Sequence, residues 1–156
     1  IIDANFFMSN HLTFQKGAID GMGCFFGASD GKRISFVSPN DMGALAAAAL
    51  LDPEAHNGKK YIAAGPAITE AEVAAFLSDH LGKDVKYTNQ SPEDFAAGMT
   101  SAGLPPFIIE NLTELEKWKA SGDADFDEGS AEMIAVLCRA PQTYPEYLAS
   151  LPKMTT

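Results

Sequence analysis

The side chains that could act as nucleophiles or metal ligands are few in this sequence, and they lie far apart. His11, His56 and His80 have no metal-ligand spacing, so we predict no metal site and expect surface or packing roles for them. Cys24 and Cys138 lie in apolar stretches without paired spacing, which is typical of reduced core thiols in an intracellular protein. No set of residues forms a complete proton relay, so we assign no catalytic residue.

Glycines are concentrated between residues 17 and 31, where five of them occur. A phosphate-binding turn requires glycines between a strand and a helix, and no such pattern surrounds Gly21-Met22-Gly23. We therefore predict a loop over residues 17–31, with Cys24-Phe25-Phe26 as its apolar anchor.

A bulky apolar cluster, Phe6-Phe7-Met8, follows a predicted turn at residues 3–5. Residues 1–8 are interpreted as the end of a strand that runs into this turn. Such a cluster either packs in the core or lines a ligand cleft, because α/β proteins bind ligands at the carboxyl ends of strands. Both alternatives remain open from the residues alone.

Composition and charge limit the class of protein. At 156 residues and 46% hydrophobic content the chain can form one domain, or part of one, with a real core. Its formal charge of -10 repels phosphate backbones, so nucleic acid is not an expected partner. No apolar run approaches the roughly 20 residues of a membrane helix. The interpretation of both cysteines as reduced thiols goes with an expected cytoplasmic location. Ile1-Ile2 is neither an initiator Met nor a signal peptide, and we interpret the chain as a fragment that begins in mid-strand.

The central predicted unit is a strand over residues 34–37 that leads into a helix ending at Leu51. Asn40 or Asp41 is the predicted helix cap, because a short side-chain oxygen can accept from unpaired amides. A strand that feeds a packed helix is the repeating unit of α/β proteins. The predicted apolar stripe of this helix is Met42, Leu45, Ala46, Ala49 and Leu50.

Capping and turn signals predict the other elements. Thr69 and Glu72 form a capping box for a helix that ends at Gly82, and Thr143 and Glu146 form another for the terminal helix. Further strands are predicted at 60–64 and 84–89, and further helices at 91–103, 107–120 and 130–137. These elements indicate an α/β protein with short strands and a helix-rich C-terminal half.

The helix over 107–120 carries both an apolar stripe and part of an acidic segment. The stripe is predicted to be Ile108, Leu112, Leu115 and either Trp118 or Lys119. Residues 110–132 contain eight acidic residues and two lysines, most simply a solvated face and loop.

Five segments in order resemble the C-terminal half of the NmrA-like family, an atypical branch of the short-chain dehydrogenase/reductases. The segment Asn5-Phe6-Phe7-Met8 is similar to the family's sequence after a late Rossmann strand, and Ser35–Met42 is similar to its strand–turn–helix signature. The other three segments are 58–69, 91–105 and 139–146. Asp3-Ala4 stands where the family has Arg-Pro, and the family's glycine-rich dinucleotide fingerprint is absent.

The resemblance implies the C-terminal part of an NAD(P)-binding Rossmann-type fold over residues 1–156, with NADP or NAD bound by the full-length protein. It implies that Ala4, Asn5 and Phe6 contact the cofactor. It also implies that Phe7, Met8 and Met22 line the side of a small hydrophobic substrate.

Three functions are compatible with this resemblance. The first is the substrate-binding half of an NAD(P)H-dependent reductase that acts on an electrophile such as a quinone, with the hydride supplied by the cofactor. The second is a non-enzymatic NADP(H) redox sensor that binds a protein partner through the acidic segment. The third is a structural subunit that has lost the cofactor. Fold alone does not choose between them.

Overall fold

Short strands form the framework of the computed structural model, which describes residues 1–126 and 129–152. Strand β4 lies between β2 and β6, parallel to β2 and antiparallel to β6. β1 pairs with β5 and β3 with β7, both in parallel. The strands are β1 (Ile2–Ala4), β2 (Phe6–Phe7), β3 (Cys24–Gly27), β4 (Arg33–Val37), β5 (Tyr61–Ala63), β6 (Ala67–Thr69) and β7 (Lys86–Asn89).

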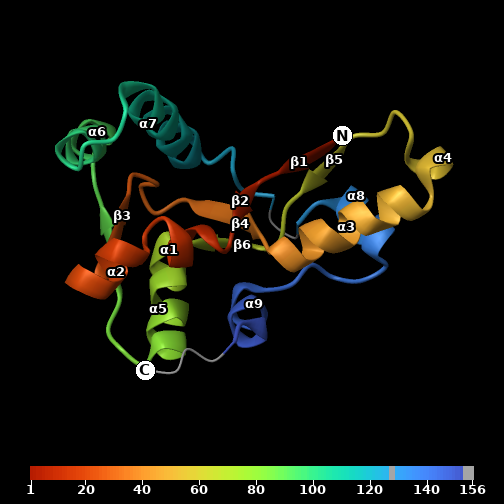
Figure 1. Cartoon of the computed structure of the whole chain (residues 1–156), viewed down its shortest axis with the longest axis horizontal. Helices are drawn as coiled ribbons and strands as arrows, with labels where there is room; N and C mark the ends of the chain where they lie inside the picture. Colours follow the sequence, from red (N-terminus) through yellow and green to blue (C-terminus); the bar gives the residue numbers. More distant parts are fainter. Residues whose placement is uncertain (127–128, 153–156) are drawn as a thin grey trace.

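Helices connect and cover these strands, as expected for an α/β protein. They are α1 (Asn10–Thr13), α2 (Lys16–Met22), α3 (Pro39–Leu51), α4 (Pro53–His56), α5 (Glu70–Leu81), α6 (Pro92–Ser101), α7 (Pro106–Ser121), α8 (Ala131–Leu137) and α9 (Tyr144–Ser150). Figure 1 shows α3 and α8 beside β1 and β5, α1 and α5 below the central strands, and α6 with α7 above β3. The predicted fold class is confirmed.

The core has two parts that meet at β4. Ile34 and Phe36 belong to the larger cluster and Val37 to the smaller one, because successive side chains of a strand point to opposite faces. The smaller cluster includes Leu45 of the predicted α3 stripe. Leu50 was predicted to share that stripe, which is wrong: it is 81% exposed, because the last turn of α3 leads away from the sheet towards α4 (Figure 1).

Helix α3 is capped by Ser38, not by Asn40 or Asp41 as predicted. The Ser38 hydroxyl accepts from the Asp41 amide at 3.0 Å. The buried Asp41 carboxylate is thereby left to accept from Arg139 Nη2 at 2.6 Å and from the Gln142 amide at 2.7 Å. Asp41 consequently ties the segment before α9 to the start of α3.

The predicted loop over residues 17–31 is wrong, because the segment contains α2 and β3. Gly23 ends α2 in the left-handed conformation with φ 66°, as a helix-terminating glycine does. β3 is stabilised by pairing with β7, which lies some sixty residues later in the chain, so local sequence could not reveal it. Phe25 is buried, which confirms the apolar anchor. β6 and α4 were not predicted either, and residues 9–19, for which a helical turn was one interpretation, contain α1 and the first part of α2.

The prediction of two core thiols is also wrong. Cys138 is exposed, because it adopts the left-handed conformation (φ 52°) that ends α8 at the surface. Cys24 is half-buried on β3, and both thiols are free.

The capping box of α5 is confirmed: Thr69 Oγ1 accepts from the Glu72 amide, and Glu72 Oε2 accepts from the Thr69 amide at 2.7 Å. Thr69→Ala should lower the free energy of unfolding by about 1 kcal/mol, because the first-turn amide loses its acceptor. Urea denaturation measures this. The matched control is Thr100→Ala in α6, whose hydroxyl bonds only a carbonyl of its own helix and caps nothing. Equal effects of the two substitutions would contradict the cap.

Candidate functional site

A hollow of about 450 Å³ lies along β1 and reaches the carboxyl end of that strand at Ala4 and Asn5. Its lining comes from β1, from β5, from the end of α7 and from the segment that follows α7, which passes beside β1 in Figure 1. The lining residues are Ile2, Asp3, Ala4, Asn5, Ile62, Trp118 and Phe126. Carboxyl ends of parallel strands are where α/β proteins bind their ligands, so this is the candidate site.

Backbone contacts hold the walls of the hollow in place. The Asn5 amide donates to Ala63 O at 2.9 Å, which fixes the turn after β1 against β5. The buried Ser35 of β4 accepts from the Phe126 amide at 2.8 Å, and its own amide donates to Ala124 O at 2.9 Å. Ser35 thus anchors the segment that carries Phe126.

The carboxamide of Asn5 has unused hydrogen-bonding capacity. Among the described residues its Nδ2 makes one long hydrogen bond, 3.5 Å to Ala124 O. A carboxamide offers two donor hydrogens and an accepting oxygen. Asn5 can therefore bind a polar group of a molecule in the hollow.

The structure brings together only some of the residues singled out in the sequence. Ala4 and Asn5 line the hollow, and Phe6 stacks on its Trp118 wall. The half-buried Phe7 packs on the smaller core cluster. Phe7, Met8 and Met22, the three residues implied to contact substrate, are all absent from the hollow lining. Met8 is 1% exposed in the larger core cluster, and Met22 is 63% exposed at the end of α2.

Trp118 is the site residue that sequence reasoning did not place. Its ring is 37% exposed and stacks on Phe6, with centroids 5.6 Å apart and planes inclined by 29°. Phe6 in turn makes an edge contact with Phe36 at 6.3 Å and lies under the Lys119 ammonium, 4.6 Å from its ring centroid. Both aromatic rings are consequently held in one orientation.

The predicted apolar stripe of α7 is wrong at Leu112 and Leu115, and of the two alternatives for its last position Lys119, not Trp118, is buried. Leu112, Leu115 and Trp118 are 36–38% exposed, whereas the charged Glu116 and Lys119 are buried. Residues one position apart on a helix are turned by about 100°, so turning Glu116 and Lys119 inward turns Leu115 and Trp118 outward. The prediction that the acidic segment is solvated is therefore wrong at Glu116. Asp127 and Glu128 of that segment lie outside the described residues.

A buried ionic cluster accounts for this orientation of α7. Lys119 Nζ donates to Glu116 Oε1 at 2.7 Å and to Glu70 Oε1 at 3.3 Å. The other oxygen of Glu116 accepts from the Ala28 amide at 2.7 Å. The other oxygen of Glu70 lies 2.8 Å from His11 Nε2. The cluster connects α7 to α5, to α1 and to the residue after β3.

The Glu70 carboxylate and the Lys119 ammonium stay charged. Burial by itself raises the pKa of Glu70, but the charges of His11 and Lys119 and their hydrogen bonds outweigh it and lower the pKa to about 2. Burial would lower the pKa of Lys119, and the carboxylates of Glu70 and Glu116 reverse this and raise it.

His11 joins the cluster to Tyr144. The Tyr144 hydroxyl donates to Met8 O at 3.1 Å and lies 2.9 Å from His11 Nδ1. Burial and the nearby Glu70 raise the pKa of Tyr144, so its hydroxyl keeps its proton. Since a carboxylate only accepts, His11 Nε2–H donates to Glu70.

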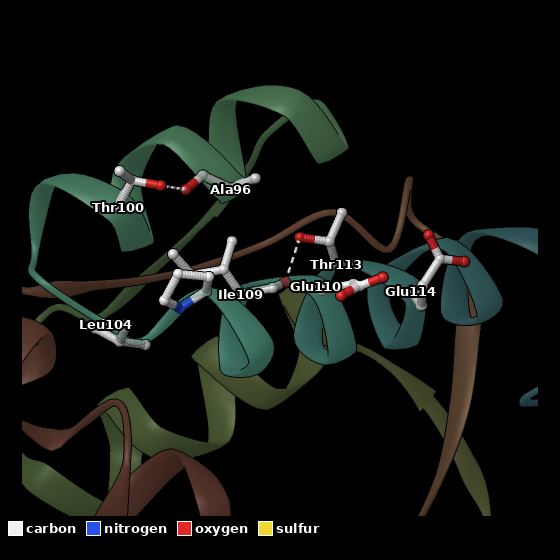
Figure 2. Close-up of a pocket in the computed structure, with 8 residues that line it drawn as sticks. Ala96, Thr100, Leu104, Ile109, Glu110, Thr113 and Glu114 are labelled. Carbon is white, nitrogen blue, oxygen red and sulfur yellow. Dashed lines mark hydrogen bonds between the residues drawn. The ribbon is translucent and has the colours of Figure 1, made fainter.

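A second hollow, of about 410 Å³, lies between α6 and α7 (Figure 2). Figure 2 shows the Thr100 and Thr113 hydroxyls turned to the carbonyls of Ala96 and Ile109 in their own helices, at 2.9 and 2.7 Å. These hydroxyls have no donor hydrogen left for a ligand. The Asn5 hollow, with its unused carboxamide, is the better candidate.

Within residues 1–126 and 129–152, no three His, Cys, Asp or Glu side chains gather as metal ligands. None of the helices in these ranges combines the length and the hydropathy that a bilayer span requires.

Comparison with known proteins relates this geometry to a family. The sequence model of the NmrA-like family matches residues 1–148. Quinone oxidoreductase 2 of Escherichia coli K12 is 34% identical over 117 residues, which are 74% of this chain and 40% of that protein. The NAD(P)H azoreductase of Xenophilus azovorans is 30% identical over 148 residues, which are 94% of this chain and 50% of that protein.

The solved structures agree with the sequence matches. An NADPH-dependent quinone oxidoreductase from Escherichia coli, solved in complex with NADPH, superposes with a TM-score of 0.78 at 29% identity. The superposition covers 94% of this chain and 50% of that one. The chain thus spans about half the length of the relatives it matches.

Removing the cation at the centre of the ionic cluster should be costly. Lys119→Met should lower the free energy of unfolding by roughly 3–5 kcal/mol, because two buried carboxylates lose a partner. Lys117→Met is the matched control on the same helix: its ammonium is exposed and pairs with the exposed Glu114, so little change in the free energy of unfolding is expected. Denaturant titration of both variants gives the comparison, and a small loss for Lys119→Met would contradict the cluster.

Acid should weaken the fold through Glu70. Its folded-state pKa of about 2 lies below the ordinary 4.5, so the folded protein binds fewer protons than the unfolded chain between those values. Stability from Glu70 is therefore present above about pH 5 and is lost as the pH falls towards 2, on the order of 3 kcal/mol in total. Glu70→Gln should reduce stability near pH 6 and flatten its decline in acid. Urea titrations of the unmodified protein and of Glu70→Gln across this pH range measure the difference. If the two free energies of unfolding fall in parallel as the pH decreases, Glu70 is not a paired carboxylate.

Proposed function

The chain belongs to the NmrA-like family, and we propose that it forms the C-terminal, substrate-side half of an NAD(P)H-dependent oxidoreductase. The substrate would be a small hydrophobic electrophile such as a quinone, and the glycine-rich half would belong to the full-length protein. The observation that carries this proposal is the hollow that reaches the carboxyl end of β1, with the Asn5 carboxamide and apolar walls.

The residues at the hollow fit the nicotinamide end of the cofactor. Asn5 has donors and an acceptor free for a carboxamide partner, and Ala4 beside it leaves room for a ring. The described residues offer the pyrophosphate no glycine-rich turn, because the sequence lacks the dinucleotide fingerprint. The N-termini of α3, α5 and α6 are already capped by Ser38, Thr69 and Ser91. We therefore expect the 156-residue chain by itself to bind NADPH poorly.

Bound NAD(P)H would supply the hydride. The chain's own residues would orient the reactants: Asn5 fixes the nicotinamide ring, and the apolar side chains of Ile62, Trp118 and Phe126 exclude water from the acceptor. Reduction of a quinone adds one hydride and one proton to give the hydroquinone. We assign no protein residue to the proton, which solvent can supply.

The relatives favour an enzyme over a redox sensor. The two named above are reductases of quinones and of azo compounds, each matched over most of this chain. The acidic segment supports a partner surface less well, because its Glu116 is buried in the ionic cluster.

The test is oxidation of NADPH by the complete protein, encoded by the full reading frame, in the presence of a naphthoquinone or an azo dye. Turnover is expected with at least one acceptor. Asn5→Ala should raise the KM for NADPH about five- to tenfold, the factor that corresponds to one lost hydrogen bond. The control Asn57→Ala makes the same change in an exposed loop and should leave KM unaltered. NADPH binding without oxidation by either acceptor would overturn the reductase in favour of the sensor.

A further inference from the structure

Trp118 occupies a position that packing alone does not explain. It is the single tryptophan of the chain, and its ring is 37% exposed while the neighbouring Lys119 is buried. A large aromatic ring ordinarily gains more from burial than a lysine does. The buried cluster of Lys119, Glu116 and Glu70 fixes the rotation of α7 against this tendency and holds Trp118 at the wall of the hollow.

The Trp118 ring is also preorganised. It stacks on Phe6 with 5.6 Å between the ring centroids, and Phe6 is braced by Phe36 and by the Lys119 ammonium. A ring held in this way loses little conformational freedom when a ligand stacks on it. The rest of the hollow adds a second aromatic wall, Phe126, and the unused donors of Asn5.

Building on the proposed function, we propose that Trp118, supported by Phe6, is the platform on which a flat aromatic electron acceptor stacks, and that this selects aromatic over non-planar substrates. The platform binds the ring face of the acceptor, in the same hollow as the Asn5 carboxamide that the proposed function assigns to the nicotinamide. The hollow of about 450 Å³ is within the roughly 300–1,000 Å³ of small-molecule sites. Lys119 acts as a positioning residue behind the platform.

The single tryptophan makes the platform directly measurable. Titration of the chain with 2-methyl-1,4-naphthoquinone should quench Trp118 fluorescence saturably, with half-saturation below about 1 mM. Both platform rings belong to this chain, so the quench does not require NADPH. N-acetyltryptophanamide corrects for absorption and collisional quenching. Leu115→Ala, one turn earlier and similarly exposed, is the matched control and should leave the titration unchanged. A linear quench equal to that of the free tryptophan analogue would overturn the platform.

Kinetics of the complete protein give the second measurement. Trp118→Leu should raise the KM for the naphthoquinone about tenfold, whereas Trp118→Phe should retain most of the affinity, because a phenyl ring still stacks. The KM for NADPH and the KM for carvone, a non-planar enone, should change less than twofold. A thermal midpoint close to that of the unmodified protein confirms that Trp118→Leu is folded.

The two proposals fail separately. Unchanged KM for the naphthoquinone in an active Trp118→Leu enzyme would overturn the platform and leave the reductase standing. Saturable quenching in a protein that oxidises no NADPH would support the platform and overturn the reductase.

Discussion

Lys119 lies inside the protein between the carboxylates of Glu70 and Glu116, and the arrangement of the surrounding elements depends on this cluster. Taking an ammonium and carboxylates out of water costs several kcal/mol for each ion, so they are retained only where geometry and further hydrogen bonds compensate. Compensation comes from His11 on one carboxylate and from the Ala28 amide on the other. If one of these contacts is broken, the desolvation cost of the buried ion that loses its partner is no longer compensated.

The ionic cluster determines which side chains of α7 face the candidate site. With Glu116 and Lys119 turned inward, Trp118 is turned to the hollow and stacks on Phe6. If burial of the apolar side chains had set the rotation of α7, Trp118 would face the core instead. The same lysine lies over the Phe6 ring, so one ammonium both anchors the helix and steadies the aromatic pair. Stability and site geometry are therefore linked through a single side chain.

Two further polar anchors tie distant parts of the chain together, and one of them fixes a wall of the hollow. Ser35 binds the backbone on both sides of Asp125, which places Phe126 at the hollow, and Asp41 binds the segment that leads into α9. Each anchor is a buried polar group joined to chain some ninety to one hundred residues away. A preformed hollow with one unused carboxamide and aromatic walls suits a reductase whose chemistry resides in its cofactor.

The sequence by itself determined the elements whose signals are local. The capping boxes at Thr69 and Thr143 are present as predicted, the helix that begins after Thr69 ends at Gly82, and the strand at residues 34–37 lies within β4. The order of short motifs also indicated the family, which the comparisons show. Ala4 and Asn5 of the implied cofactor site lie at the hollow, although their role stays a prediction.

Only the tertiary structure decided the rest. β3 forms because β7 pairs with it. The glycines around β3 favour a loop when only the local sequence is considered. The orientation of α7 follows from partners on α5, on α1 and after β3, so a pattern that counts apolar residues placed the wrong face inward. Trp118 became a site residue for the same reason: the balance between burying a ring and pairing a charge depends on groups that meet only in the folded chain.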